Sequence, residues 1–173
     1  MGKDISQQFA DCMPNIEKEV NRVVLANMEQ FGDDMVSRVL PEQAEYRNLT
    51  GNTLTSYSYG IYLDGILQLM NYFDGSPAIR RKLKKDEIVR DFVDYDGNNR
   101  TYFQANIDTD ADYGVNSASL FLQTYKPKGK YSIVFTTGTE YSAYLENVRD
   151  LNVLTEGFQH SKSAFLSSFK PIS

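Results

Sequence analysis

The first forty residues carry an apolar stripe with helical spacing. Side chains that recur every three or four positions lie on one face of an α-helix. The stripe consists of Phe9, Cys12, Ile16, Val20, Val23, Met28, Phe31, Met35 and Val39. The pattern therefore predicts one long amino-terminal helix that ends at the sequence LPEQ, residues 40–43.

Two starting points for this helix are compatible with the sequence. Asp4 and Gln7 have the spacing of a capping box, which favours a start at Asp4. Pro14 would then lie inside the helix, where its ring removes a backbone donor. The pattern thus allows a kink at Pro14, or a later start near Asp11 with Pro14 in the first turn.

The centre of the chain predicts two β-hairpins. Tyr59, Ile61 and Leu63 alternate as one face of a strand does, and Asp64–Gly65 separates them from the run ILQLM. Farther along, the runs EIVRDFVDY and RTYFQANI flank Asp96–Gly97. Because Asp-Gly is typical of tight hairpin turns, each pair of runs predicts two antiparallel strands.

The second half of the chain predicts two more helices with a strand between them. In the run NSASLFLQTY, Asn116 is a plausible N-cap, and a strand is the alternative to a helix. The predicted helical face there consists of Ala118, Phe121, Leu122 and Tyr125. A strand, KYSIVF, follows, and then a terminal helix that Gly157 weakens. Its stripe consists of Val153, Phe158, Ser161, Phe165 and Phe169.

These elements indicate an α+β fold, with a long N-terminal helix, an antiparallel hairpin-rich sheet and a C-terminal amphipathic helix. A length of 173 residues is typical of one domain. We therefore expect a single domain, residues 1–173, with a longer central segment, residues 72–129, inserted between the sheet strands.

Composition and charge narrow the classes of partner. The net charge of -5 disfavours sequence-independent binding to nucleic acid, because an acidic chain repels phosphates. The chain has 12 Tyr, a residue that is enriched at protein interfaces. A single cysteine, Cys12, excludes an intrachain disulfide, and we expect it to be an inert small hydrophobe in a reducing cytoplasm. The sequence shows no secretory signal and no apolar run of membrane-spanning length.

An acidic loop and one histidine are the residues to weigh for metal binding or catalysis. Asp108, Asp110 and Asp112 match three positions of a calcium loop, but Tyr113 and Ser119 stand where that loop needs Gly and a bidentate Glu. One His and one Cys cannot fill a closed zinc site. We therefore expect no bound metal.

His160 could act as a general base beside Cys12 or a serine, but nothing in the sequence brings a partner to it. Glu140 and Glu146 have the chemistry of a glycosidase pair, yet with 23 acidic residues such pairs arise everywhere. No phosphate-binding loop or nucleophile motif occurs. We expect no catalytic residue, no cofactor and no enzymatic activity.

A basic run and the stretch TTGTEYSAYLE, residues 136–146, are the candidate binding surfaces. The basic run could contact nucleic acid or an acidic partner, or it is a solvated loop offset by Asp86, Glu87 and Asp91. It consists of Arg80, Arg81, Lys82, Lys84 and Lys85.

In TTGTEYSAYLE, the sequence predicts a short helical turn that starts near Thr139, which can cap it. Tyr141, Tyr144 and Leu145 then share a face. With Glu146 they are the candidates for a subunit interface, and the alternative is that the three simply fill the core.

Two stretches, NLTGNTLTS and later GTEYSAYLE before a last helix, resemble the tail-completion, or head–tail connector (neck), proteins of tailed phages. The first motif matches at Leu49, Thr50, Gly51, Asn52 and Leu54, with Thr53 as an extra residue. The second matches at Tyr141, Ala143, Tyr144 and Glu146, with Ser142 where that family usually has Ala. The family's usual aromatic and Gly-Thr after the Glu are replaced by residues 147–149, and its Pro-Phe-Leu before the last helix by residues 151–154.

The resemblance implies a structural virion protein assembled in the host cytoplasm. Such a protein forms a homo-oligomeric ring at the head–tail junction, next to portal and tail proteins, and DNA passes through it without specific binding. An acidic ring suits that passage, because it does not hold phosphate. The alternatives are a small cytoplasmic enzyme that uses Asp/Glu chemistry, or a monomeric protein-binding adaptor.

Overall fold

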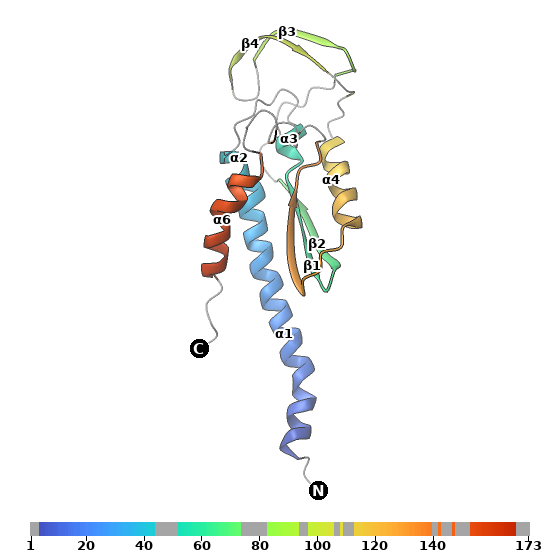
Figure 1. Ribbon diagram of the computed structural model, residues 1–173, viewed down its shortest axis with the longest axis vertical. Helices are drawn as coiled ribbons and strands as arrows, with labels where there is room; N and C mark the ends of the chain where they lie inside the picture. Colours follow the sequence, from blue (N-terminus) through green and yellow to red (C-terminus); the bar gives the residue numbers. More distant parts are fainter. Residues whose placement is uncertain are drawn as a thin grey trace.

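The computed structural model describes residues 4–43, 52–73, 83–93, 97–105, 108, 113–139, 142, 147 and 153–168 (Figure 1). Its elements are α1 (Ile5–Asp34), η1 (Met35–Val39), α2 (Leu40–Gln43), α3 (Asn52–Thr55), β1 (Ser58–Leu63), β2 (Ile66–Tyr72), β3 (Ile88–Val93), β4 (Asn99–Gln104), α4 (Tyr113–Thr124), β5 (Tyr131–Thr136) and α6 (Thr155–Ser168). The predicted α+β class, with a long N-terminal helix, antiparallel strands and a C-terminal helix, is confirmed.

Helix α1 begins at Ile5, so the alternative start near Asp11 is wrong and Pro14 lies inside the helix. Asp4 occupies the N-cap position with an extended backbone, φ -62° and ψ 149°. Its side chain makes no capping hydrogen bond, so the predicted capping box does not form. The helix tolerates Pro14 because a proline removes only one backbone donor, while the turns on either side stay intact.

The long helix changes its hydrogen bonding before it ends. Residues Met35–Val39 form a π-helical turn, in which the N–H of Leu40 donates to the carbonyl of Met35. Pro41 comes next, and a proline ring clashes with the carbonyl four residues before it in a regular α-helix. The wider π turn accommodates this proline, and the chain continues into α2 without a break.

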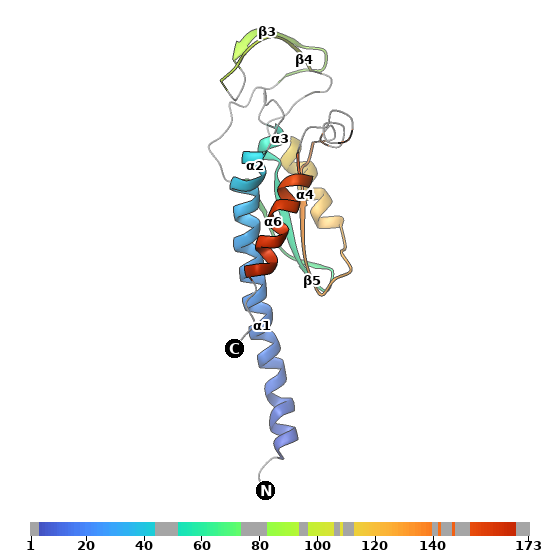
Figure 2. The ribbon, with the colours of Figure 1, turned by 60° about the vertical axis from the view of Figure 1, so that its left-hand side comes forward.

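Three strands form an antiparallel sheet in the order β2-β1-β5. The predicted Asp64–Gly65 turn joins β1 to β2, and both residues have positive φ, 51° and 75°, as a type I′ turn requires. Helix α1 covers one face of this sheet and α4 covers the other, and α6 lies beside the end of α1 (Figures 1 and 2). The fold is therefore a helix–sheet–helix sandwich around the central strand β1.

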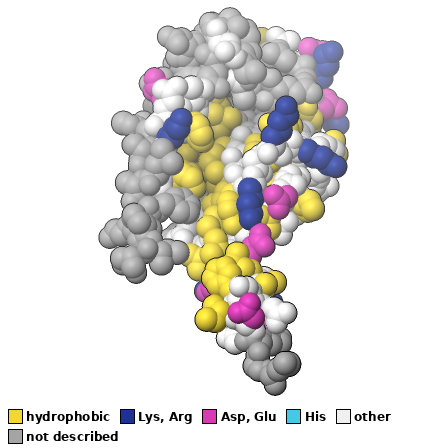
Figure 3. Space-filling view, turned by 60° about the horizontal axis from the view of Figure 1, so that its bottom comes forward, with side chains coloured by type: hydrophobic (Ala, Val, Ile, Leu, Met, Phe, Trp, Pro, Cys, Tyr) yellow, Lys and Arg dark blue, Asp and Glu magenta, His cyan; other side chains and the backbone are white. Residues whose placement is uncertain are grey.

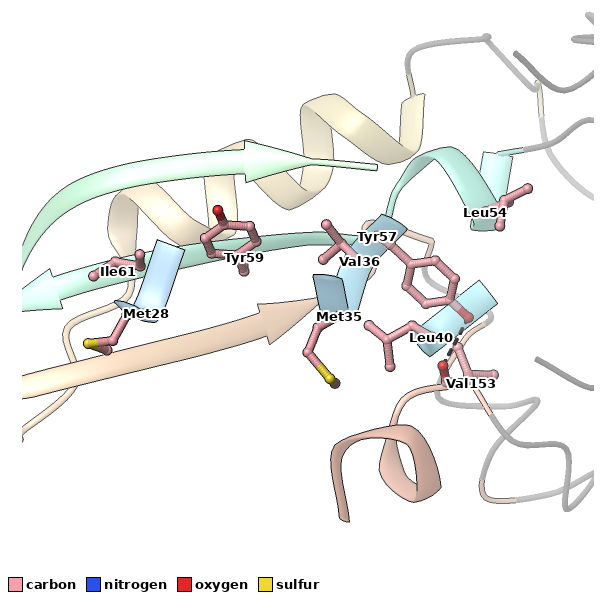
Figure 4. Packing of buried hydrophobic residues seen from close by; sticks show 9 residues of the cluster. All are labelled: Met28, Met35, Val36, Leu40, Leu54, Tyr57, Tyr59, Ile61 and Val153. Atoms are coloured by element: carbon pink, nitrogen blue, oxygen red, sulfur yellow. Dashed lines mark hydrogen bonds between the residues drawn. The ribbon is translucent and has the colours of Figure 1, made fainter. Parts of the chain in front are cut away.

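Strand β1 and the residue before it hold these layers together through three buried tyrosines. Because side chains alternate along a strand, Tyr59 reaches α1 on one face of the sheet and Tyr62 reaches α4 on the other. Tyr57 donates to the Val153 carbonyl at 2.9 Å, Tyr59 to the Asp33 carboxylate at 2.7 Å, and Tyr62 to the Leu122 carbonyl at 2.6 Å. Figure 4 shows the first of these bonds within the buried cluster.

Gly32 is the point of closest approach between α1 and the sheet. A Cβ placed on Gly32 would lie 2.4 Å from the Cε2 atom of Tyr59, whose side chain is fully buried. Only glycine allows the helix to lie this close to the ring. The apolar stripe identified the right face of α1 here, since Met28 and Met35 are also buried.

We expect Gly32→Ala to lower the free energy of unfolding by about 1–3 kcal/mol, the usual cost of overpacking. This loss should exceed the gain of up to about 1 kcal/mol in helix propensity. Urea unfolding measures the difference, with Gln30→Ala at an exposed position of the same helix as the control. The same small effect for both variants, within about 0.5 kcal/mol, would contradict the close contact.

Two predicted helical faces need correction. Helix α4 begins at Tyr113, so Asn116 is not its N-cap, and the strand alternative is wrong. Ala118 and Leu122 are buried as predicted, but Phe121 and Tyr125 are 42% and 44% exposed. The small residues Gly114 and Ala118 face inward because a backbone segment packs against them, as described below.

In the terminal segment, Val153 and Ser161 are buried, but Phe158 is 42% exposed. Gly157 is buried, and a Cβ there would lie 2.8 Å from the Cδ2 atom of Leu40. The glycine that weakens α6 as a helix therefore allows α6 to approach α2. Phe165 is half-buried and packs on Phe31 of α1, with ring centroids 4.4 Å apart.

Strands β3 and β4 form the second predicted hairpin, which is separate from the three-stranded sheet (Figure 2). Gly97 has a φ of 80°, as a tight turn requires. The large apolar side chains Ile88, Val93 and Tyr102 are 47%, 61% and 53% exposed. A hairpin that buries this little is marginally stable alone, so its stability depends on the chain around it.

Candidate subunit interface

The stretch that follows β5 contains a cluster of hydroxyl groups. Thr139 and Ser142 are almost fully buried, and their hydroxyls are hydrogen-bonded to each other. Thr137 joins them through its own hydroxyl, 2.6 Å from that of Ser142 and 3.1 Å from that of Thr139. The three groups exchange hydrogen bonds among themselves. This arrangement satisfies the buried hydroxyls and stabilises the described part of the loop.

The predicted turn at Thr139 is present, because the Ser142 N–H donates to the Thr139 carbonyl at 3.0 Å. Gly138 fixes the position of this turn against α4. A Cβ on Gly138 would lie 1.6 Å from the Gly114 carbonyl oxygen and 2.7 Å from the Ala118 N. The backbone at Gly138, just before the turn, thus packs directly on the backbone of α4.

The four residues predicted for the subunit interface, Tyr141, Tyr144, Leu145 and Glu146, lie outside the described residues. Whether they form an interface or a core stays a prediction. Gly138, which precedes them in the sequence, lies just after β5 and against α4 at Gly114 and Ala118.

Two exposed apolar surfaces on the helices were not predicted from the sequence. The first is the amino-terminal part of α1, residues 4–23, here called the stalk; its first turns project beyond the sheet (Figure 1), and Asn21 near its other end contacts Tyr131 of β5. Every residue from Asp4 to Val20 is exposed. Its large apolar side chains include Ile5, Phe9, Met13, Ile16, Val20 and Val23. Figure 3 shows hydrophobic side chains gathered along the stalk, with acidic side chains beside them.

The second surface is the outer face of α4, here called the α4 face, with Leu120, Phe121 and Tyr125. Leu120 is 64% exposed, and the rings of Phe121 and Tyr125 stack with their centroids 5.2 Å apart. The α4 face and the stalk belong to helices on opposite faces of the sheet (Figure 1). Periodicity missed the α4 face because Phe and Tyr are expected to point inward.

The basic run lies partly outside the described residues, which include Leu83, Lys84 and Lys85. The N–H of Lys85 donates to the Asp108 carboxylate at 2.7 Å, and Lys84 Nζ lies 3.5 Å from it. These contacts lower the pKa of Asp108, and the backbone hydrogen bond from Lys85 has the largest effect. The described part of the run is therefore offset by acidic residues, as in the solvated-loop interpretation, although Asp108 was not among the predicted partners.

The remaining candidates for catalysis or metal binding are His160, Cys12 and the acidic side chains. His160 lies in α6, and the structure describes nothing of its side chain, while Cys12 is exposed on the stalk. Among the residues that the structure describes, no group of three or more His, Cys, Asp or Glu side chains is placed to hold a metal ion. Asp110, Asp112, Glu140 and Glu146 lie outside the described residues.

Two of the buried tyrosines that hold the layers together have raised pKa values. Burial raises the pKa of Tyr59, and its hydrogen bond to the Asp33 carboxylate raises it further. Burial also raises the pKa of Tyr62. Both hydroxyls are donors to groups of neighbouring helices, so these shifts stabilise the neutral phenols in the folded chain.

The fold and its surfaces define a small α+β chain with two exposed apolar helix faces. Compared with protein-family models, with curated proteins and with solved structures, the chain shows no match. Within the described ranges, none of the helices combines the length and the apolar character needed to cross a bilayer.

Proposed function

We propose that the chain is a structural protein of a tailed-phage virion and forms a ring at the head–tail junction, through which DNA passes. The observation that carries the proposal furthest is the stalk. A row of large apolar side chains exposed along a projecting helix favours binding of another protein surface, because monomeric soluble proteins rarely expose large contiguous apolar patches.

Two further observations support this proposal over the alternatives. The order of the motifs NLTGNTLTS and GTEYSAYLE resembles that of head–tail connector proteins, and the long first helix, hairpin and last helix follow the same order. The buried hydroxyls and tyrosines in the described residues serve packing, which favours a structural role over an Asp/Glu-dependent enzyme. A monomeric adaptor could also use the stalk to bind a partner. The location of the chain, inside or outside a ring in the virion, therefore decides between the ring subunit and the adaptor.

The proposal predicts a specific defect in phage assembly. A stop codon early in the reading frame, in the phage that encodes the chain, should leave DNA-filled heads and finished tails that do not join. Electron microscopy of the lysate detects the separate parts, and the intact chain supplied from a plasmid is the control. An electron cryomicroscopy reconstruction of the whole virion should show the chain in a symmetric ring. Normal virions from the mutant, or a chain located outside any ring, would contradict the proposal.

A further inference from the structure

The exposed stripe of the stalk lies on a different face of α1 from the residues that pack into the core. At 3.6 residues per turn, Phe9, Ile16 and Val23 lie about a third of a turn away from Met28 and Met35, which face the core. The stripe is therefore not the buried face of α1 continued beyond the end of the body. Phe9 is 63% exposed, Ile16 48% and Val23 42%. Burying such side chains against another apolar surface is favourable.

The charge of the stalk restricts what can cover it. Residues 4–23 contain four acidic and two basic side chains, so the net charge of the stalk is -2. Two stalks packed against each other would bring like charge together, which disfavours such a pair. A surface of anionic lipid is disfavoured for the same reason. The charge favours an apolar surface with basic side chains around it.

The chain itself offers such a surface at the α4 face. Residues 113–130, from the start of α4 to the start of β5, contain three lysines and no acidic side chain. Lys126 and Lys128 directly follow the exposed Phe121 and Tyr125, and both lysines are exposed. Within one copy, Lys130 Nζ binds Glu17 of the stalk at 2.9 Å, so this lysine is already paired, and Lys126 and Lys128 are the basic side chains left for the stalk of another copy.

We propose that the stalk of one copy packs along the α4 face of the next copy. This inference rests on the proposed function and names the surfaces that form the ring. Because the stalk and the α4 face lie on opposite sides of the sheet, the contact joins two different patches. Such heterologous contacts do not stop at a dimer and continue until the rotation closes a ring. Helix α4 has 12 residues, a length of about 18 Å, so each contact is short and ring closure supplies much of the stability.

The single cysteine makes this contact testable. Cys12 is exposed on the stalk, and Thr124 is exposed on the outer side of α4. In a Thr124→Cys variant at high concentration, mild oxidation should produce a ladder of disulfide-linked dimers, trimers and larger species. The wild-type chain, with Cys12 alone, should stay monomeric on the same non-reducing gel. Thr101→Cys on the separate β3–β4 hairpin is the matched control for random collisions.

A charge placed on the stripe separates specific from accidental cross-links. Ile16→Glu in the Thr124→Cys background should remove the ladder, whereas Asn15→Glu, which adds the same charge beside the stripe, should retain it. Both residues are exposed, so both variants should melt at the wild-type temperature. Dimers of the wild-type chain through Cys12, a ladder that survives Ile16→Glu, or a Thr124→Cys ladder no stronger than that of Thr101→Cys would overturn the inference.

The result of the cross-linking experiment can be read separately from the result of the phage experiment. Absence of the ladder together with a ring in the virion would show that other surfaces make the ring, and would leave the proposed function intact. A stripe-dependent ladder from a chain that is absent from the virion would support the contact and refute the function. Ile16-dependent binding to neutral phosphatidylcholine vesicles without a ladder would assign the stripe to a lipid surface, and would overturn the inference.

Discussion

Replacing Gly138 by alanine is expected to lower the free energy of unfolding by about 3 kcal/mol, at the upper end of what overpacking costs. The new Cβ would lie 1.6 Å from the Gly114 carbonyl oxygen, 2.6 Å from its carbonyl carbon and 2.7 Å from the Ala118 N. These are backbone atoms of α4, so no side-chain rotation relieves the overlap. Urea unfolding followed by circular dichroism measures the loss.

Gly157→Ala is the matched control, because it makes the same chemical change at another buried glycine. The nearest atom to its Cβ is the Cδ2 of Leu40 at 2.8 Å, the far end of a flexible side chain. We expect a loss within about 1 kcal/mol, offset in part by the better helix propensity of alanine. Equal losses at Gly138 and Gly157 would show that the turn after β5 is not in close contact with α4.

Raising the pH above about 10 is expected to destabilise the fold steeply. The ordinary pKa of tyrosine is 10.0, and burial raises the pKa of both Tyr59 and Tyr62 in the folded chain. Below that pH both states keep the phenol proton, and the stabilisation is fully present. Above it the unfolded chain loses protons that the folded chain keeps, so stability falls by up to about 1.4 kcal/mol per pH unit for each tyrosine.

Between pH 10 and pH 11.5 Tyr59 should account for a loss of up to about 2 kcal/mol, and the raised pKa of Tyr62 adds to this loss. Urea unfolding at a series of pH values gives the slope, which should fall in Tyr59→Phe and again in Tyr62→Phe. Tyr102→Phe is the control, because that side chain is 53% exposed in the folded state. If all three variants have the wild-type slope, alkaline unfolding has another cause.

The hairpins were predictable from the sequence because their determinants are local. Asp64–Gly65 must adopt positive φ in a two-residue turn, and the flanking runs alternate with the period of a strand. The order of the strands in the sheet was not predictable, because β1 pairs with β5 across about 70 residues of chain and no turn specifies that partner.

Helix α4 shows why hydrophobicity alone can predict the wrong buried face of a helix. Phe121 and Tyr125 are more apolar than Gly114 and Ala118, and periodicity placed the aromatic residues inward. The structure buries the small residues, because the backbone at Gly138 needs the space next to α4. A sequence records which residues are apolar, but it does not record which neighbour will come close enough to exclude a large side chain.

The candidate interface was predictable only in part. The stripe of α1 was evident from its spacing, but the spacing did not separate Met28, which faces the core, from Phe9, which lies on a different and exposed face of the helix. Which face is covered is a property of the tertiary structure. The turn at Thr139 was predicted from its residue types, and the neighbouring Tyr141, Tyr144, Leu145 and Glu146 stay a prediction.

The central position of β1 also determines how the chain would carry a mechanical load. A pull on the stalk reaches the sheet through α1, whose Asp33 holds the Tyr59 hydroxyl, and β1 is hydrogen-bonded along both edges to β2 and β5. In an antiparallel sheet these bonds are perpendicular to the strands. A force along the strand therefore loads many bonds together in shear, rather than one at a time. Strand β1, at the middle of the sheet, is therefore placed to resist tension applied through the projecting helix.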